Sequence, residues 1–388
     1  MSESGPSRLR VLVISLGRRG GVTRYGQLMA EELARFCEVA AISSSTAENR
    51  QRWMSLGDRH LEVETFSSVA TMFASVLAVK RFARIRQFAV RFRPDVVYYP
   101  GGHAWKPILD LLLPRSARVV LTVHDPQPHP GEDNAATRLF AWSNRWRVDG
   151  YVLLNESQRQ GFIARHRLDP ARVAMVPLGV FDDVMHAVRP LAVVDGLEHL
   201  DGNAGRYLLF VGRIQRYKGV GTLLEAYASI APGIRAPLVI AGAGSFTADE
   251  KRRIAELGDG SLTVVNRWLS DTEIASLVAA ARFVVLPYTS ASQSGVIPLA
   301  SAFGVPAIAS DAGGLVEQVV DGKTGLLCMA GDVASIAAAL ERASAMKESE
   351  RAAMSEQCRE HAHTEWGWTS LAARLGAFFA SLRAGLRA

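Results

Sequence analysis

Two basic residues stand in a short segment bounded by glycines, residues 212–219, which reads GRIQRYKG. Arg213 and Lys218 are five positions apart, after the apolar run YLLFV and before a segment with helical spacing. A guanidinium presents a planar fork of donors and an ammonium a compact charge, so the pair suits the oxygens of a diphosphate. Solvated surface cations are the alternative. We interpret the two residues as candidate ligands and electrostatic catalysts for a phosphorylated substrate.

A second segment is rich in hydrogen-bond donors and has no charge: residues 287–306 read PYTSASQSGVIPLASAFGVP. Its polar centre follows the apolar run FVVL and precedes a helix that we expect to begin near Val296. A helix start offers N–H groups to an anion, and no carboxylate stands here to repel one. An ordinary serine-capped helix start is the alternative. The residues of interest are Gln293, Ser294, Gly295 and Val296.

Two further loops follow apolar runs that read as buried strands. GRRGGV, residues 17–22, follows RVLVISL, and its Gly20 and Gly21 would let a phosphate approach the backbone at the start of a helix. The fingerprint G-x-G-x-x-G of dinucleotide sites is missing, and a plain tight turn is also compatible. The loop TVHDPQPHPGE begins at Thr122, and its His124 could donate to a sugar hydroxyl or to a developing negative charge. A satisfied core histidine is the other reading.

The composition is that of a globular protein: of 388 residues, 48% are hydrophobic and 21% are charged. No apolar run reaches the length of a membrane span. The N-terminus, MSESGPSRLR, has no apolar signal region, so we expect a cytoplasmic protein. The net charge of +6 is compatible with several kinds of anionic partner. The loops above favour a phosphorylated small molecule, and we expect no nucleic-acid partner.

One basic segment indicates a surface for an anionic membrane or acceptor. Residues 65–94 contain no acidic residue, and helical spacing puts their apolar residues on one face. Lys80, Arg84 and Arg91 fall on the opposite face. A basic amphipathic helix of this kind is a candidate for peripheral association with the inner face of a membrane. A solvated helix face is equally compatible with the pattern.

Strand and helix signals alternate along nearly the whole chain, which predicts an α/β fold with two doubly wound, Rossmann-like parallel-sheet domains. We expect the first domain over residues 1–185 and the second over 206–365. Residues 186–205 have weak periodicity and read as a linker. Residues 366–388 form a helix expected to pack back on the first domain. The two sheets would face each other across a cleft at the carboxyl ends of their strands, where such folds bind ligands.

The chain resembles the retaining glycosyltransferases of family four, which have the GT-B fold. The resemblance covers nearly the whole sequence. The motifs that carry it are GGVTRYGQLMAEELA at Gly20, TVHDPQPHPGE at Thr122, GRIQRYKG at Gly212 and PAIASDAGGLVEQVVDGKTGLL at Pro306.

The resemblance implies a nucleotide-diphospho-sugar donor, UDP- or GDP-linked, bound mainly by the C-terminal domain. It implies a glycan or lipid-linked acceptor bound mainly by the N-terminal domain. In this sequence Arg213 and Lys218 match the cations on the donor diphosphate. Gly20 and Gly21 match a glycine loop that approaches the same group, and His124 matches a histidine that contacts the transferred sugar.

In the neutral segment, the backbone from Ser294 to Val296 matches amides that hold the diphosphate. The base would lie near the backbone of Asn266 to Trp268. One departure is clear, because the two glutamates of much of the family are replaced here by Ala291 and Leu299. Gln293 and Ser294 could take their place, which suggests a subgroup with a Ser-Gly-Val turn.

These features predict a retaining, metal-independent hexosyltransferase in surface polysaccharide or glycolipid synthesis. No acidic pair stands at a predicted strand end, since Asp182 and Asp183 read as turn residues, and we expect no cofactor. A sugar-nucleotide epimerase on the same frame is an alternative. So is a non-catalytic protein that binds sugar nucleotides or anionic lipid. An NAD-dependent oxidoreductase ranks last, because AGAGSF at Ala241 lacks the acidic residue that would hold a ribose.

Overall fold

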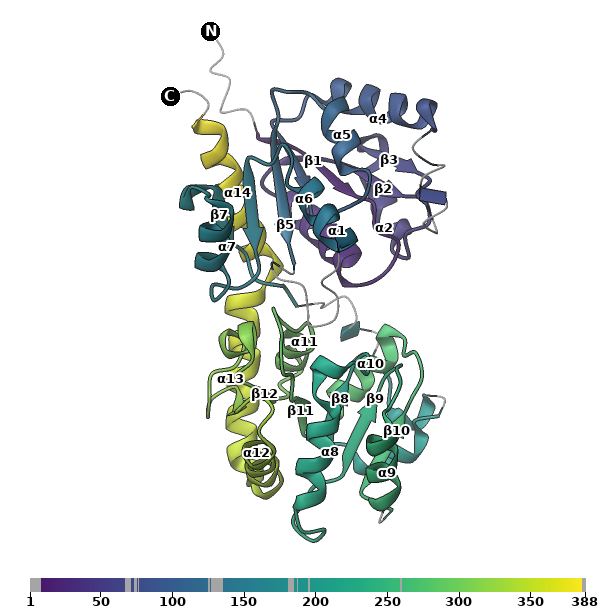
Figure 1. The fold of residues 1–388 in the computed structure, drawn as a ribbon, viewed down its shortest axis with the longest axis vertical. Coiled ribbons are helices and arrows are strands. Elements are labelled where there is room, and N and C mark those ends of the chain that lie inside the picture. The colour runs from purple at the N-terminus through teal and green to yellow at the C-terminus, as the bar shows by residue number, and fades with distance from the viewer. Residues whose placement is uncertain are drawn as a thin grey trace. The chain divides into compact units, whose positions relative to one another are not determined.

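The computed structural model describes residues 8–385 except 67–70, 73–74, 76, 125, 127–134, 181–184, 187, 195 and 259. The chain divides into two compact units, residues 1–177 with 368–388, and residues 178–367. Each unit has its own parallel sheet with helices between the strands (Figure 1). The predicted α/β class with two Rossmann-like domains is therefore confirmed.

The sheet of the first unit has the strand order β3-β2-β1-β4-β5-β6-β7, and its neighbouring strands are parallel. Its strands are β1 (Arg10–Ser15), β2 (Glu38–Ser44), β3 (His60–Val63), β4 (Val96–Tyr99), β5 (Arg118–Val123), β6 (Gly150–Leu153) and β7 (Val173–Met175). Its helices are α1 (Gly21–Leu33), α2 (Arg50–Trp53), α4 (Val79–Phe92), α5 (Lys106–Leu112), α6 (Ala135–Asn144), α7 (Arg159–His166) and α14 (Trp368–Ala384), with 3-10 turns η1 (Met54–Arg59) and η2 (Pro170–Arg172).

The chain reverses its direction of travel across this sheet between β1 and β4. Connections between parallel strands are right-handed, so α1 covers one face, while α4, α5, α6 and α7 cover the other. The C-terminal helix α14 packs beside α1, and Thr369 donates to Glu32 Oε2 at 2.7 Å (Figure 1). The carboxyl ends of β1 and β4 diverge at the reversal, and ligands of open α/β sheets bind at such a point.

Two residues of α5 form a fully buried ion pair. Lys106 and Asp110 have 0% exposed side chains, and Nζ lies 2.6 Å from Oδ2. The ammonium also donates to the carbonyl of Trp146 at 2.9 Å, and the Tyr99 hydroxyl donates to Asp110 Oδ1 at 3.0 Å. Burial lowers the pKa of Lys106 and raises the pKa of Asp110. Each partner therefore depends on the other to remain charged.

The sheet of the second unit has the order β10-β9-β8-β11-β12-β13, again parallel throughout its named pairs. Its strands are β8 (Leu208–Val211), β9 (Leu238–Ala241), β10 (Leu262–Val265), β11 (Phe283–Leu286), β12 (Ala307–Ser310) and β13 (Gly325–Cys328). Its helices are α8 (Val220–Ser229), α9 (Ala248–Glu256), α10 (Asp271–Ala279), α11 (Val296–Ala302), α12 (Val333–Ala345) and α13 (Glu348–Trp366), with 3-10 turns η4 (Leu191–Val193), η5 (Glu198–Asn203), η6 (Arg216–Lys218) and η7 (Gly313–Glu317). The reversal here falls between β8 and β11, so the loops after these two strands are the expected ligand-binding loops.

Residues 186–205, which the sequence predicts to be a linker, belong to the second unit instead. Their apolar side chains are buried in its core, namely Leu191, Val194, Leu197 and Leu200. The spacing of three residues matches the period of the 3-10 turns η4 and η5, and it fits neither an α-helix nor a strand. That is why the segment reads as aperiodic. Asp182 and Asp183 lie outside the described residues.

Candidate active site

The loop after β8 brings a lysine to the carboxyl edge of the second sheet. Lys218 Nζ donates to the hydroxyl of Tyr288 at 3.0 Å and lies 4.6 Å from the centroid of that ring. It also lies 3.2 Å from the point where a Cβ on Gly212 would stand, so the ammonium points back over the end of β8. Among the described residues no carboxylate pairs with Lys218. Its charge is therefore free to attract an anionic ligand.

Arg213 stands on the same loop and is exposed. Its guanidinium forms no ion pair or hydrogen bond with any residue that the structure describes. The two cations predicted from GRIQRYKG thus share one loop at the strand reversal, and neither is neutralised there.

Glycines allow the neighbouring strand-end loops to touch. Gly219 has φ +69°, and a Cβ there would lie 1.9 Å from the carbonyl oxygen of Pro287. Gly242 has φ +145°, and its Cβ would lie 2.0 Å from the carbonyl oxygen of Gly212. Any side chain at either position would push the loops apart. This close approach fixes the ends of β8, β9 and β11 around Lys218.

A glutamine far along the chain holds the neutral turn after β11. The Ser294 N–H donates to Gln318 Oε1 at 2.8 Å, and Gln318 Nε2 donates to the Ser294 carbonyl at 3.0 Å. The Val296 N–H donates to Ser294 Oγ at 3.3 Å. The amides of Ser294 and Val296, which the resemblance assigns to a diphosphate, both donate to side chains of the protein, so their role in binding a diphosphate stays a prediction. Gly295, just before α11, has no such bond to a described residue and is the amide that fits the expectation.

The two positions where the family resemblance implies glutamates are packed inside the second unit. Ala291 and Leu299 are each 6% exposed, so a carboxylate at either position would be buried. Gln293 is half-buried on the same turn, and its Oε1 has no hydrogen-bond partner among the described residues. A buried acceptor without a donor is suited to a hydroxyl supplied by a ligand.

The predicted base-binding residues lie at the end of β10. The side chain of Asn266 is used internally, since it accepts from Gly244 N–H at 3.2 Å and donates to Gly244 O at 3.1 Å. Trp268 is 75% exposed, so its indole is not part of the core. Asn266 therefore positions the loop after β9, and only backbone and the exposed indole remain for a ligand.

A cavity of about 460 Å³ opens among these loops within the second unit. It is lined by Gly219, which follows Lys218, and by Gln215, Glu250 and Thr289. Its volume is within the range of small-molecule sites. Gln215 Oε1 is buried without a partner in the described part of the chain, which adds a second unused acceptor. No sequence signal marked Gln215 or Gln318, because a lone glutamine carries no periodicity.

In the first unit, the glycine loop after β1 is exposed and open. Gly20 precedes α1 with φ +88°, and nothing lies within 4 Å of a Cβ added at Gly20 or Gly21. The Gly20 N–H donates to Glu48 Oε1 at 2.7 Å. A carboxylate of the protein thus accepts from the amide expected to face a phosphate, and the phosphate role of Gly20 stays a prediction. Gly21 keeps its N–H without a partner among the described residues.

His124 directly follows β5 and lines a different cavity. Its Nε2 donates to the carbonyl oxygen of Pro100 at 2.7 Å, and its ring packs edge-on against Tyr25 at 5.2 Å between centroids. The carbonyl fixes a proton on Nε2, so Nδ1 is the acceptor of the neutral ring. The ring of His124, just after β5, is therefore held in place by the carbonyl of Pro100 and by Tyr25, and its role toward a sugar stays a prediction. Asp125 and residues 127–134 of the same loop lie outside the described residues.

The cavity that His124 lines has a volume of about 430 Å³ and lies wholly within the first unit. It extends from the glycine loop to α6 and α7, where Asn144, Arg145 and His166 line it. The sequence analysis missed these three residues. The sequence offers little to identify them, because they stand in or next to predicted helices and belong to no motif.

The predicted basic helix is α4. Its buried side chains are Phe82, Ile85, Ala89 and Phe92, and Lys80, Arg84 and Arg91 are exposed as expected. Val79 and Val90 are exposed as well, at 75% and 47%. The outer face of α4 thus combines cations with apolar side chains.

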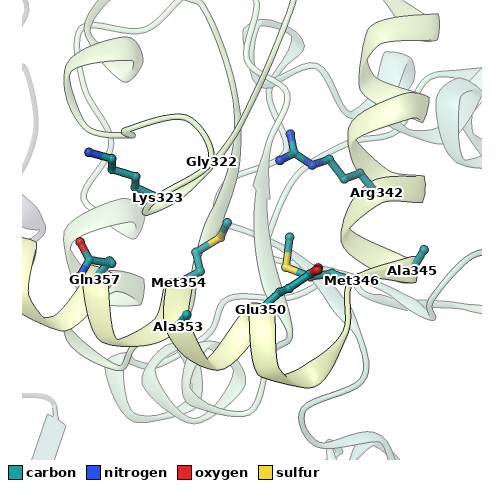
Figure 2. A pocket seen from close by; sticks show the side chains of 9 residues that line it. All are labelled: Gly322, Lys323, Arg342, Ala345, Met346, Glu350, Ala353, Met354 and Gln357. Atoms are coloured by element: carbon teal, nitrogen blue, oxygen red, sulfur yellow. The ribbon is translucent and has the colours of Figure 1, made fainter.

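A third cavity, of about 690 Å³, lies in the second unit between α12, α13 and the turn before β13. Figure 2 shows Lys323 and Arg342 at its rim and Met346 and Met354 at its base. Because the turn precedes β13, this cavity is at the amino edge of the sheet, opposite to the edge that carries Lys218. It is therefore separate from the candidate site.

Within the described residues, no helix is long and apolar enough to cross a membrane. The same part of the chain contains no group of three or more His, Cys, Asp or Glu side chains arranged to hold a metal ion.

Comparison with protein families divides the chain as the fold does. Residues 20–179 match the family model of the glycosyl transferase 4-like domain, and residues 199–361 match that of glycosyl transferases group 1. A D-inositol 3-phosphate glycosyltransferase of Mycolicibacterium paratuberculosis is 34% identical over 248 residues, which are 62% of this chain. The match spans only 54% of that relative's length.

Solved structures share the whole fold. A glycosyltransferase from Rickettsia africae has a TM-score of 0.74 at 15% identity, with 97% of this chain and 98% of that chain covered. The Anabaena protein HepE, solved with UDP and glucose, has a TM-score of 0.71 at 17% identity, with 96% and 100% covered. At such identities the likeness shows the fold, which is of the GT-B type.

Proposed function

We propose that this chain, whose two units match glycosyl transferase family models, transfers a sugar from a UDP-linked donor to an acceptor hydroxyl with retention at the anomeric carbon. One observation carries the proposal: Arg213 and Lys218 stand on one strand-end loop at the reversal point of the second sheet, and no described carboxylate neutralises them. The UDP complex of the structural neighbour HepE supports the choice of nucleotide.

The two cations act on the leaving group. As the bond between the sugar and the diphosphate breaks, negative charge grows on the diphosphate oxygens. Fixed positive groups aimed at that charge lower the barrier, because they need no reorganisation during the step. Lys218 is held by Tyr288 and has little freedom to turn away. Arg213 is exposed and can close on the diphosphate when it binds.

Neutral groups orient the sugar and the rest of the donor. The unpaired Oε1 of Gln293 can accept from a sugar hydroxyl, and the Gly295 N–H can donate to a phosphate oxygen. His124 is a candidate to contact the transferred sugar from the first unit. The base is proposed to lie near Trp268, whose indole is exposed.

No side chain of the described site is placed as a nucleophile for a covalent intermediate. We therefore infer front-face attack, in which the acceptor hydroxyl approaches on the side of the leaving group. The donor phosphate takes the acceptor proton as the new bond forms. The cations can stabilise the diphosphate without a metal ion, so activity should persist in EDTA.

The acceptor is proposed to belong to a surface polysaccharide or a glycolipid. The exposed cations and valines of α4 support this, because such a face suits anionic headgroups with shallow apolar contact. Binding to anionic vesicles at low salt that is no greater than binding to neutral vesicles would count against membrane association.

The decisive test is turnover of UDP-sugars by Lys218→Ala and Arg213→Ala. Each variant should lose on the order of a hundredfold in kcat, with little change in unfolding midpoint. Lys323→Ala, on an exposed turn at the opposite edge of the same sheet, is the matched control and should keep wild-type turnover. Near wild-type rates in both site variants would refute the assignment. Conversion of a donor sugar without any acceptor would favour an epimerase.

A further inference from the structure

The cavity of the first unit contains a guanidinium that has no counter-ion among the described residues. Arg145 is half-buried and lines the cavity together with His166. Its Nε donates to the carbonyl of Ala141 at 2.9 Å, and its Nη1 lies 2.8 Å and 2.6 Å from the two ring nitrogens of His166. No carboxylate of a described residue pairs with this guanidinium.

The described residues that line the cavity add positive charge and no carboxylate. Burial lowers the pKa of Arg145, and Arg165 lowers it further. Burial and the same two arginines lower the pKa of His166 to about 4, so its ring is neutral near pH 7 and can accept from Arg145. Arg19 lines the same cavity from the glycine loop, and none of the described lining residues is acidic.

A partly buried charge without a partner is costly, and proteins normally pair it. Arg145 is held against His166 and is one of the residues that line a cavity of about 430 Å³. That volume is large enough for a small-molecule ligand. A phosphate group would supply the missing charge and accept two parallel hydrogen bonds from the guanidinium.

We propose that this cavity is an anion subsite of the acceptor, in which Arg145, oriented by His166, binds a phosphate group. The acceptor is then a phosphorylated molecule, and its source is either a soluble sugar phosphate or a lipid phosphate. The identification of the ligand as the acceptor rests on the proposed function. The anion subsite itself depends only on the geometry of the first unit.

The test measures binding of inorganic phosphate by calorimetry at constant ionic strength. It uses the double variant Lys218→Ala with Arg213→Ala as the parent, which removes both cations of the proposed donor site. Adding Arg145→Met should weaken phosphate binding about tenfold or more, the value of one charge-assisted bidentate contact. Arg145→Lys should retain most of the affinity. Arg115→Met, on the exposed turn before β5, is the matched control and should change nothing. Circular dichroism of each variant checks that the fold is kept.

Two further arms identify the source of the phosphate. Glucose 6-phosphate against glucose tests a soluble ligand, and vesicles with phosphatidic acid against phosphatidylcholine alone test a lipid. Arg145-dependent binding in either arm supports the subsite and names its source. Phosphate binding that is absent in the parent, or equal in Arg145→Met, overturns it. UDP binding by the wild-type protein is measured in parallel. If UDP does not bind, the proposed function is refuted, whereas the anion subsite is still decided by the phosphate titrations alone.

Discussion

The bidentate contact between Gln318 and Ser294 offers a sharp test of how the active-site turn is held. Gln318→Leu keeps the size of the side chain but removes both the donor and the acceptor. Ser294 and Gln318 are 6% and 8% exposed, so water cannot easily replace the lost partners. Each buried backbone group left without a partner costs about 1–3 kcal/mol. After about 1 kcal/mol is returned by the added apolar surface, the second unit should lose about 3 kcal/mol.

The assay is urea unfolding followed by circular dichroism, together with UDP-sugar turnover. Gln357→Leu is the matched control, because it makes the same chemical change on the exposed face of α13 and should cost little. The site variant should also lose turnover, since the Ser294 turn carries Gly295 and Gln293 into place. A stability loss below about 1 kcal/mol would mean that water satisfies the turn equally well. The positioning argument would then fail.

Two further predictions concern the first unit. Asp110→Asn should destabilise the protein by about 3–5 kcal/mol in denaturant unfolding, because it leaves the buried ammonium of Lys106 unpaired; the double change Lys106→Met with Asp110→Leu should recover most of that loss, and an equal loss in both would contradict the reasoning. Burial lowers the pKa of His103 to about 4, and the Nδ1 atom of its ring accepts from the Trp105 N–H. Between about pH 6.5 and 4, His103 is therefore protonated in the unfolded chain but neutral in the folded protein. The contribution of His103 to the free energy of unfolding should therefore be fully present above about pH 6.5 and should fall as the pH drops, by about 2 kcal/mol at pH 5. His103→Asn should remove this part of the pH dependence. An unchanged pH profile in the variant would show that other groups cause the dependence.

The fold could be predicted because its signals are local. Buried parallel strands read as apolar runs, and β8 and β11 appear as LLFV and FVVL between helical patterns. The start of α11 at Val296 was also predictable from the preceding polar turn. The order of strands then follows from the preference for short right-handed connections.

The candidate site was only partly predictable, for a physical reason. The loop with Arg213 and Lys218 is contiguous, so its spacing is visible in the sequence. The contacts that decide which amides remain for a ligand join distant segments: Gln318 reaches Ser294, and Glu48 reaches the glycine loop. A single polar residue far along the chain leaves no pattern, and such contacts appear only in the folded structure.

The replacement of the two glutamates changes where binding energy can come from. A carboxylate that accepts from a sugar hydroxyl makes a charge-assisted bond, worth about 1.5–3 kcal/mol, whereas an amide oxygen such as Gln293 Oε1 contributes about 0.5–1.5 kcal/mol. If glutamates are the ancestral residues at the two positions, as the family resemblance implies, Ala291 and Leu299 also mean two fewer negative charges in the second unit. We infer that this chain binds its donor more through the diphosphate and less through the sugar. Interactions with the diphosphate strengthen as charge develops during bond cleavage, so energy moved from the sugar to the leaving group favours the transition state over the ground state. The missing glutamates are therefore compatible with an active enzyme, and they point to a site that recognises its donor sugar less strictly.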